Sequence, residues 1–502
     1  MKLREKISLE NSLKWFAARC TLSLLTSTTP YTHGLYTPLL LLSMLPGAAL
    51  LLYLFFVDRS VYRRPYFPFF FLFCVSYGVT ILLNRHSGFF SNCGQLMYTG
   101  FYFFLFFCAF SSLRAEAREA TLRLLCRMVL VFSMVVACLS LGMMLANYSA
   151  EIFLNGASFL IGFHQRNVGM QLTGITTGPS TLSALSLLGI FSVCYLFHES
   201  RGTWRWLGIF CGAVLLFTVG AANAYSALIA MLAFAVLFVF CRNLGETPSK
   251  HFARRSADTV VQMLVCCLLV TGCFYGTQKL ETAAVNGITQ AVYQHELKEI
   301  EAQEPSTPGT SVPGELPSDP TSPGQPDLPE QPDLPAQPDL PEQPQEVTIS
   351  RDVATSANGT RSAIWREGIK LFLAHPLGVT NNAISVKVFY GVPDYEYRNL
   401  HNGYLTLLAA SGIVGFALIL AFGVLFFVRA MQALFRCTDA RRRLRLSVLI
   451  AACGAILAAD LVNGCFVLWR NLQYIFLWLL LGEICAQITE PSPALTSPSG
   501  AE

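Results

Sequence analysis

The sequence predicts an all-α integral membrane protein with about twelve transmembrane helices and one long extracytoplasmic loop. Of its 502 residues, 53% are hydrophobic and only 13% are charged, whereas a soluble domain carries about 25% charged residues. Many apolar runs also reach the roughly 20 residues that a helix needs to cross a hydrocarbon layer about 30 Å thick. These runs are continuous rather than alternating, which favours membrane helices over membrane strands.

Each apolar run is interpreted as one transmembrane span. The first span is the weakest, because it is short and carries Arg19. The expected spans are 14–29, 36–56, 67–84, 92–111, 126–146, 178–197, 205–221, 224–241, 258–276, 404–428, 444–466 and 471–487.

The positions of lysine and arginine indicate the orientation. If the N-terminus is cytoplasmic, the inner loops are rich in these residues, whereas the short outer loops hold few, namely Arg85, Arg166 and Arg470. By the positive-inside rule, we expect a multi-pass protein of the cell membrane with both termini in the cytoplasm. The expected parts are N-terminal membrane helices (1–276), an extracytoplasmic loop (277–402), C-terminal membrane helices (403–487) and a cytoplasmic tail (488–502).

The outer loop is expected to have three regions. Residues 277–303 look weakly helical, and 305–344 are so rich in proline that they favour extended polyproline II over a folded core. We interpret 305–344 as a solvated spacer, with a wall-penetrating or partner-binding arm as the alternative. A helix over 361–374, stopped by His375 and Pro376, is expected to lie on the membrane surface with its apolar side down.

Arginines on the outer face oppose the positive-inside trend and therefore need a reason. One reason is phosphate recognition, because the planar, permanently charged guanidinium matches phosphate oxygens. The other interpretation is snorkelling at the interface or a salt bridge. Arg361, Arg398 and Arg166 flank one outer vestibule in the expected topology, which favours a shared role in binding.

Two outer histidines are candidates for proton transfer. His401 stands at the mouth of the span over 404–428, and an ordinary pKa of ~6.5 suits a general base near neutral pH. A helix-capping role is the alternative for His401. His375 precedes a proline and is more typical of a turn, with substrate binding as the alternative.

Two carboxylates fall within the expected spans. Asp460 is costly in lipid unless it is paired, and Arg470 is its expected partner. A structural pair and a role in the site both remain open for Asp460 and Arg470. Glu483 and Arg19 lie near span ends and are expected to snorkel to the interface.

Composition and motifs argue against several other classes. The chain has neither an Asp-x-Asp nor a His-Glu-x-x-His motif, and it has no glycine-rich phosphate loop. Its sixteen cysteines lie mostly in apolar runs, where they act as small hydrophobic residues. The net charge of +4 arises from short loops and does not indicate nucleic-acid binding. We therefore expect no metal, no cofactor and no nucleic-acid partner.

Four short motifs in the C-terminal third resemble the signature of the O-antigen ligase and O-antigen polymerase family. That signature has an Arg-x-x-x-Trp helix, a His-Pro-x-Gly-x-Gly-like turn, a His-Asn pair and a glycine-spaced helix start. The matching runs are Arg361 to Trp365, Ala374 to Val379, His401 to Leu405 and Ser411 to Phe416.

The resemblance implies a function at the outer leaflet. Such proteins take a glycan from a polyprenyl-diphosphate carrier and attach it to a lipid, glycan, wall or protein acceptor, by a reaction that resembles metal-independent transfer with inversion. Carried over to this chain, His401 deprotonates the acceptor hydroxyl, Arg361 contacts the diphosphate, and Asn402 orients His401 or the sugar.

The chain departs from the family pattern at three places. Relatives often have Ser-Arg at the start of the eighth span, where this chain has Ala224 and Tyr225. They often have an arginine before the sixth span, where this chain has Gln171, so Arg166 is the candidate to replace one missing arginine. Thr380 stands in the position of the second glycine of the turn.

Two other classes were weighed against a glycosyltransferase. A transporter or flippase of lipid-linked glycans should show broken helices and ionisable residues near the bilayer midplane. Here the polar candidates gather toward the outer face, which favours an enzyme. A non-catalytic scaffold that uses the proline-rich arm is the third possibility.

Overall fold

The computed structural model describes residues 2–154, 157–166, 169–197, 201–244, 252–303, 360–388 and 395–489. The proline-rich insert and nearly all of the expected C-terminal tail lie outside the described residues.

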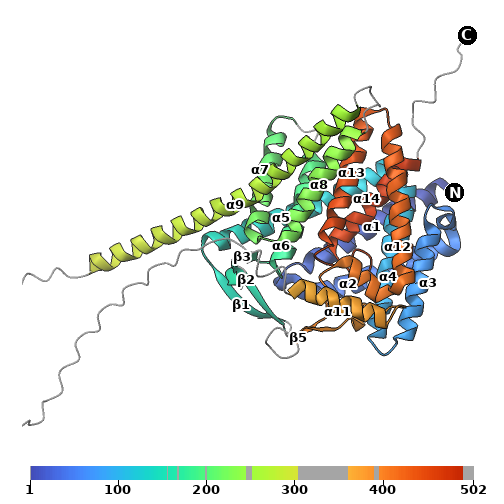
Figure 1. Cartoon of the computed structure of the whole chain (residues 1–502), viewed down its shortest axis with the longest axis horizontal. Coiled ribbons are helices and arrows are strands. Elements are labelled where there is room, and N and C mark those ends of the chain that lie inside the picture. The colour runs from blue at the N-terminus through green and yellow to red at the C-terminus, as the bar shows by residue number, and fades with distance from the viewer. Residues whose placement is uncertain are drawn as a thin grey trace, which may run out of the picture.

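The described chain is mainly a bundle of long helices (Figure 1). Their apolar sequences and lengths match what a helix needs to cross a bilayer. The helices are α1 (Lys2–Thr26), α2 (Pro30–Leu52), α3 (Phe67–Leu83), α4 (Phe89–Gly100), α5 (Ala115–Leu145), α6 (Pro179–Phe197), α7 (Thr203–Ala222), α8 (Tyr225–Leu244), α9 (Phe252–Gln303), α11 (Thr360–Ala374), α12 (Gly403–Arg436), α13 (Ala440–Ala459) and α14 (Leu472–Thr489).

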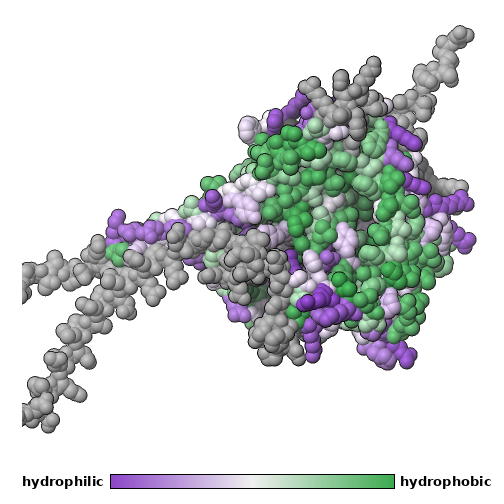
Figure 2. All heavy atoms as spheres, viewed as in Figure 1, coloured by the Kyte–Doolittle hydropathy of each residue, from purple (hydrophilic) through white to green (hydrophobic). Residues whose placement is uncertain are grey.

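Within the described residues, nine helices are long and apolar enough to cross a membrane. The chain is therefore a multi-pass helical membrane protein. Three of the twelve expected spans do not reach that standard. α3 has only 17 residues, whereas α1 and α13 carry too many charged side chains along their lengths. Figure 2 shows apolar side chains over much of the middle of one face, with hydrophilic ones toward its edges.

A small β-sheet interrupts the helical pattern between α5 and α6. Strands β1 (Ser149–Leu154), β2 (Ala157–Arg166) and β3 (Gly169–Gly174) form an antiparallel sheet in the order β1-β2-β3. The sequence analysis expected only a loop here. The sheet and α11 lie at the same end of the bundle (Figure 1), which is called the sheet end below.

α9 is a single helix of 52 residues. At 1.5 Å per residue it is about 78 Å long, more than twice the thickness of the hydrocarbon layer. It joins the expected span over 258–276 to the weakly helical region that follows, without the expected boundary at 276. Its C-terminal half projects away from the bundle (Figure 1).

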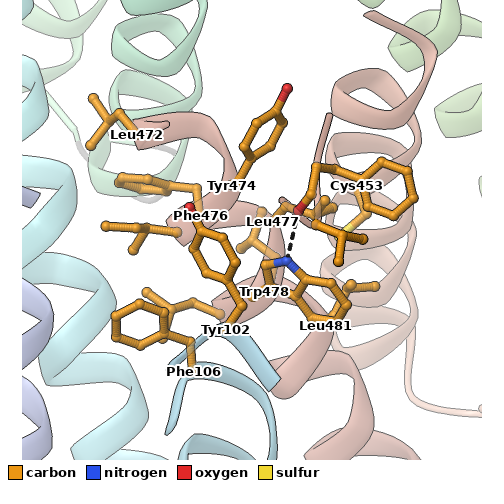
Figure 3. Packing of buried hydrophobic residues seen from close by; sticks show 14 of the residues in the cluster. Tyr102, Phe106, Cys453, Leu472, Tyr474, Phe476, Leu477, Trp478 and Leu481 are labelled. Carbon is orange, nitrogen blue, oxygen red and sulfur yellow. Dashed lines mark hydrogen bonds between the residues drawn. The ribbon is translucent and has the colours of Figure 1, made fainter. Parts of the chain in front are cut away.

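α14 lies in the centre of the bundle. Trp478 is fully buried, and its indole N–H donates to the Phe466 carbonyl at 3.1 Å (Figure 3). Tyr102 and Phe106, from the π-helical continuation of α4 (Phe101–Ala109), lie beside it. Such dense aromatic packing fixes the positions of the helices that support both ends of the bundle.

Opposite the sheet end, four charged side chains form a cluster that we call the ion-pair cluster: Arg118, Glu119, Arg445 and Glu483. Arg118 Nε lies 2.7 Å from Glu483 Oε2, and only 2% and 3% of these two side chains are exposed. Arg445 lies 3.1 Å from Glu483 and 2.9 Å from Glu119. The expectation that Glu483 snorkels was therefore wrong, because buried arginine satisfies its charge inside the protein.

Candidate functional site

The start of α12 holds His401 in a constrained position. Asn402 caps the helix, its Oδ1 accepting from the backbone N–H groups of Tyr404 and Leu405 at 3.1 and 3.0 Å. His401 has a positive φ of 49°, which is uncommon outside glycine, and its N–H donates to Asn399 Oδ1 at 2.8 Å. Asn402 therefore caps α12 and, through this cap, fixes the position of His401.

Gly403 explains why α12 begins where it does. A Cβ at this position would lie 2.1 Å from the Gly464 carbonyl oxygen and 3.1 Å from Asp460 Cβ. The Gly403 N–H also donates to the Asp460 carbonyl at 2.7 Å. Only glycine permits this close approach, so the turn after α13 is seated directly against the His401 end of α12.

α11 brings Arg361 to His401. Ile364 is buried, and a Cβ on Gly368 would lie 3.0 Å from the Leu400 and Leu405 side chains, so one face of α11 packs on the start of α12. Burial lowers the pKa of His401 from its ordinary value of 6.5, and the positive charge of Arg361 lowers it further. The two candidates that the sequence paired therefore act on each other.

α12 is interrupted at Gly412, where φ is 69° and ψ is −177°. The turn after α11 fills the interruption. Val379 and Thr380 donate their N–H groups to the Ala409 and Ala410 carbonyls, both at 3.0 Å, and the Ile413 N–H donates to the Pro376 carbonyl at 2.9 Å. The backbone groups around the break are thereby satisfied by the His-Pro-x-Gly turn, not by a ligand.

Polar side chains of α3 and α4 hold that turn from the other side. Thr80 Oγ1 donates to the Leu377 carbonyl at 2.9 Å, and Asn84 Nδ2 donates to the Gly378 carbonyl at 3.2 Å. Asn92 Nδ2 donates to Thr380 Oγ1 at 3.0 Å. Thr380 has φ 70° and ψ 157°, a region that is essentially reserved for glycine. The backbone of Thr380 is strained because threonine stands where the family pattern has glycine.

Asp460 does not pair with Arg470. The Asp460 carboxylate is buried just beyond the end of α13, rather than inside a span, and its Oδ1 accepts from the Tyr474 hydroxyl at 2.7 Å. Its Oδ2 makes no hydrogen bond within the described residues. Arg470, at the other end of the α13–α14 turn, is near Tyr36 of α2 and Tyr102. The expected ion pair is replaced by a hydroxyl–carboxylate bond.

The remaining candidates are more scattered. His375 is exposed at the end of α11, and Arg398 is exposed one residue after the short strand β5 (Tyr395–Tyr397), which pairs with β4 (Val386–Val388). Arg166 ends β2, where it pairs with Gly169; its side chain is not among the described ones. The contacts given above join His401, Asn402, Arg361 and the Asp460 backbone.

Sequence reasoning missed two features of this site. The buried polar side chains of α3 and α4 were read only as parts of apolar spans, although Asn84, Asn92 and Gln95 stand out in those runs. The other feature is the state of Trp365, which the sequence analysis named only as part of the Arg-x-x-x-Trp motif: its indole nitrogen is buried without a hydrogen-bond partner in the described chain. In the part of the chain that the structure describes, no group of three His, Cys, Asp or Glu side chains could hold a metal ion.

The fold defines a multi-pass helical membrane protein, with His401, Arg361 and the buried Asp460 near one end of the bundle. Comparison with known families gives the particular one: the O-antigen ligase family model matches residues 170–420, half of the chain, and the protein belongs to that family. No match was found among curated proteins. The matched stretch includes Arg361 and His401, so the predicted family is confirmed, and the protein is a membrane enzyme of polysaccharide biosynthesis.

Proposed function

We propose that this protein is a glycosyltransferase that moves a glycan from a polyprenyl-diphosphate carrier to an acceptor at the outer face of the cell membrane. The acceptor is a lipid, a growing glycan or a wall group. Family membership supports ligase or polymerase chemistry. The observation that carries the residue assignment is the half-buried His401, whose pKa is lowered in part by Arg361.

In the proposed step, an acceptor hydroxyl attacks the anomeric carbon of the carrier-linked glycan. The new carbon–oxygen bond forms as the bond from that carbon to the diphosphate oxygen breaks, with inversion. The hydroxyl proton passes to His401, and the polyprenyl diphosphate leaves with the bonding electrons. Arg361 stabilises the negative charge that grows on this leaving group.

The lowered pKa of His401 suits the proposed roles of both His401 and Arg361. A general base must be neutral before it accepts a proton, and the lowered pKa favours the neutral form of His401. Arg361 contributes to that depression while it offers its charge to the diphosphate. When the diphosphate neutralises Arg361, His401 becomes more basic at the moment when it is needed.

The other candidates have supporting parts. Arg398 and Arg166 are proposed to meet the diphosphate or the glycan from the rim, and His375 to contact substrate at the exposed end of α11. Asn402 positions His401 through its cap on α12. Asp460 and Arg470 support the turn that seats Gly403.

The sheet end is proposed to face outward, with both termini in the cytoplasm. This orientation is supported by the arginines at the opposite end of the bundle, where α12 ends and α13 begins, since cytoplasmic loops carry the excess of basic residues.

The test is glycan transfer by membranes that contain His401→Ala. We expect transfer to fall by about 10²- to 10⁴-fold, as for loss of a general base, while protein level and membrane insertion stay normal. His295→Ala is the matched control, because His295 is 74% exposed on α9. Full transfer by the His401→Ala protein would overturn the base assignment.

A transporter or flippase is the second candidate, because α12 is a broken helix and such helices mark transporter sites. In this chain the turn after α11 occupies the break, which supports the enzyme instead. Movement of a carrier-linked glycan across vesicles that hold only this protein would favour the transporter.

A further inference from the structure

α1 and α2 form a groove that plays no part in the proposed reaction. Its volume is about 770 Å³, and Ser12, Trp15, Arg19, Pro46 and Leu50 are among the residues that line it. It lies in the N-terminal part of the chain, outside the stretch that matches the family.

The groove has a closed floor and two different walls. A Cβ added at Gly47 would lie 2.6 Å from Phe101 and 2.7 Å from Phe16, so the two helices touch beneath the groove. Along α1 the lining is mixed and includes Ser12 and Arg19, whereas along α2 it is apolar. The polar groups of the groove therefore come from α1.

Arg19 lacks a counter-charge. No acidic side chain in the described chain forms an ion pair with it. The nearest acid along α1, Glu10, is held by Arg114 through two contacts of 2.9 and 2.6 Å. Arg19 brings an exposed, permanently charged guanidinium to the lining, so this groove favours a negatively charged group.

The surroundings indicate a lipid rather than a small soluble anion. Leu41, Leu42 and Leu45 of α2 are exposed large apolar side chains beside the groove, as expected on a surface that faces acyl chains. Trp15 and Tyr53 in the lining are the side chains that prefer the boundary between headgroups and hydrocarbon.

We propose that this groove binds a phospholipid with an anionic headgroup. The headgroup phosphate accepts from the Arg19 guanidinium and from Ser12, and an acyl chain lies along Ala49 and Leu50 of α2. A guanidinium binds phosphate oxygens in a fork geometry, and basic pockets between membrane helices bind acidic headgroups in this way.

The test is native mass spectrometry of the full-length protein in detergent, with phosphatidylglycerol or phosphatidylcholine added. We expect the wild type to retain phosphatidylglycerol at least five-fold better than phosphatidylcholine, and Arg19→Gln to lose that preference. Lys14→Gln removes a charge from the same helix outside the lining, and we expect it to keep the preference. Inorganic phosphate is added in a further experiment, and we expect it to compete poorly with phosphatidylglycerol.

Three results would overturn the proposal: equal retention of both lipids by the wild type, an unchanged preference in Arg19→Gln, or displacement of the lipid by inorganic phosphate. If Arg19→Gln fails to fold, Ala49→Trp replaces it. The tryptophan fills the apolar wall while Arg19 stays, and it should lower retention of phosphatidylglycerol. This outcome is independent of glycan transfer, so loss of the proposed function would not affect it.

Discussion

The two ends of the bundle treat their buried carboxylates, Glu483 and Asp460, in different ways. In the ion-pair cluster, Glu483 is contacted by Arg118, by Arg445 and by Gln487 Nε2 at 2.9 Å. At the sheet end, Asp460 Oδ2 and the Trp365 indole nitrogen are buried without hydrogen-bond partners in the described chain, and His401 and Thr380 have strained backbones.

This difference separates stability from function. A charge that is fully paired inside the protein gives the fold a fixed arrangement, and removing one partner is costly. At the sheet end, the incompletely bonded Asp460 and the strained His401 and Thr380 lie around the proposed reaction site. Substitutions at the first end should therefore change stability alone, and those at the second should also change transfer.

Arg118→Met gives the largest expected effect on stability. It leaves the buried Glu483 with only Arg445 and Gln487, and we expect a loss of about 3 kcal/mol, the lower end of the range for a broken buried pair. Arg123→Met on the same helix removes a partly exposed pair and should cost about 0.5 kcal/mol or less. Unfolding monitored by tryptophan fluorescence measures both. Equal losses would remove the distinction between buried and surface pairs.

Gly412→Ala should cost about 2 kcal/mol, because a Cβ there would lie 2.4 Å from the Leu377 carbonyl carbon and φ is positive. Transfer should fall with it, since the turn that seats in α12 must shift. Gly423→Ala is the matched control on the same helix, with nothing within 4 Å; it should stabilise by about 0.5–1 kcal/mol. If Gly412→Ala changed neither stability nor transfer, the break in α12 would not be needed for either.

Arg361→Gln should change the pH dependence of transfer. Burial remains as the larger cause of the lowered His401 pKa, but the contribution of Arg361 is lost. The pKa therefore rises, and the acid limb of the rate profile moves to higher pH, because a protonated imidazole cannot act as base. Arg366→Gln, which alters an exposed residue of α11, should leave the limb in place. The rate of glycan transfer by both variants, measured from about pH 5 to pH 9, tests this difference.

Thr380→Gly gives the smallest expected change. Glycine relieves the strained backbone, worth about 1–3 kcal/mol, but it loses the bond from Asn92 and adds about 0.5–1 kcal/mol of backbone entropy cost. We expect a net gain of about 1 kcal/mol in unfolding free energy. Thr380→Ser keeps the hydroxyl and the strain, so it should show no gain. A loss of stability in the glycine variant would mean that the Asn92 bond outweighs the strain.

The sequence predicted what depends on local pattern. The helix expected over 361–374 was found at Thr360–Ala374, and α12 begins one residue before the expected start. Asn155 and Gly156 between two apolar runs are a strong hairpin signal, so β1 and β2 could also have been predicted.

Other features depend on contacts that a single sequence does not contain. Arg118 and Glu483 are 365 positions apart, and each one alone reads as a charge near a span end. The break at Gly412 was hidden because glycine inside an apolar run only lowers helix propensity by about 1 kcal/mol; the turn that fills the break makes it stable. Asp460 likewise found Tyr474 instead of the arginine nearest in the sequence.

The crossing of Gly378 and Gly412 has a consequence for how such chains can evolve. A Cβ on Gly378 would lie 2.6 Å from the Gly412 nitrogen, and a Cβ on Gly412 would meet Leu377 from the other side. Gly378 and Gly412 each face the backbone of the other segment, so neither can be replaced by a larger residue unless that backbone moves. A substitution at one position cannot make room for a substitution at the other. Across relatives, the two positions should therefore stay glycine together, or the turn and the helix break should disappear together.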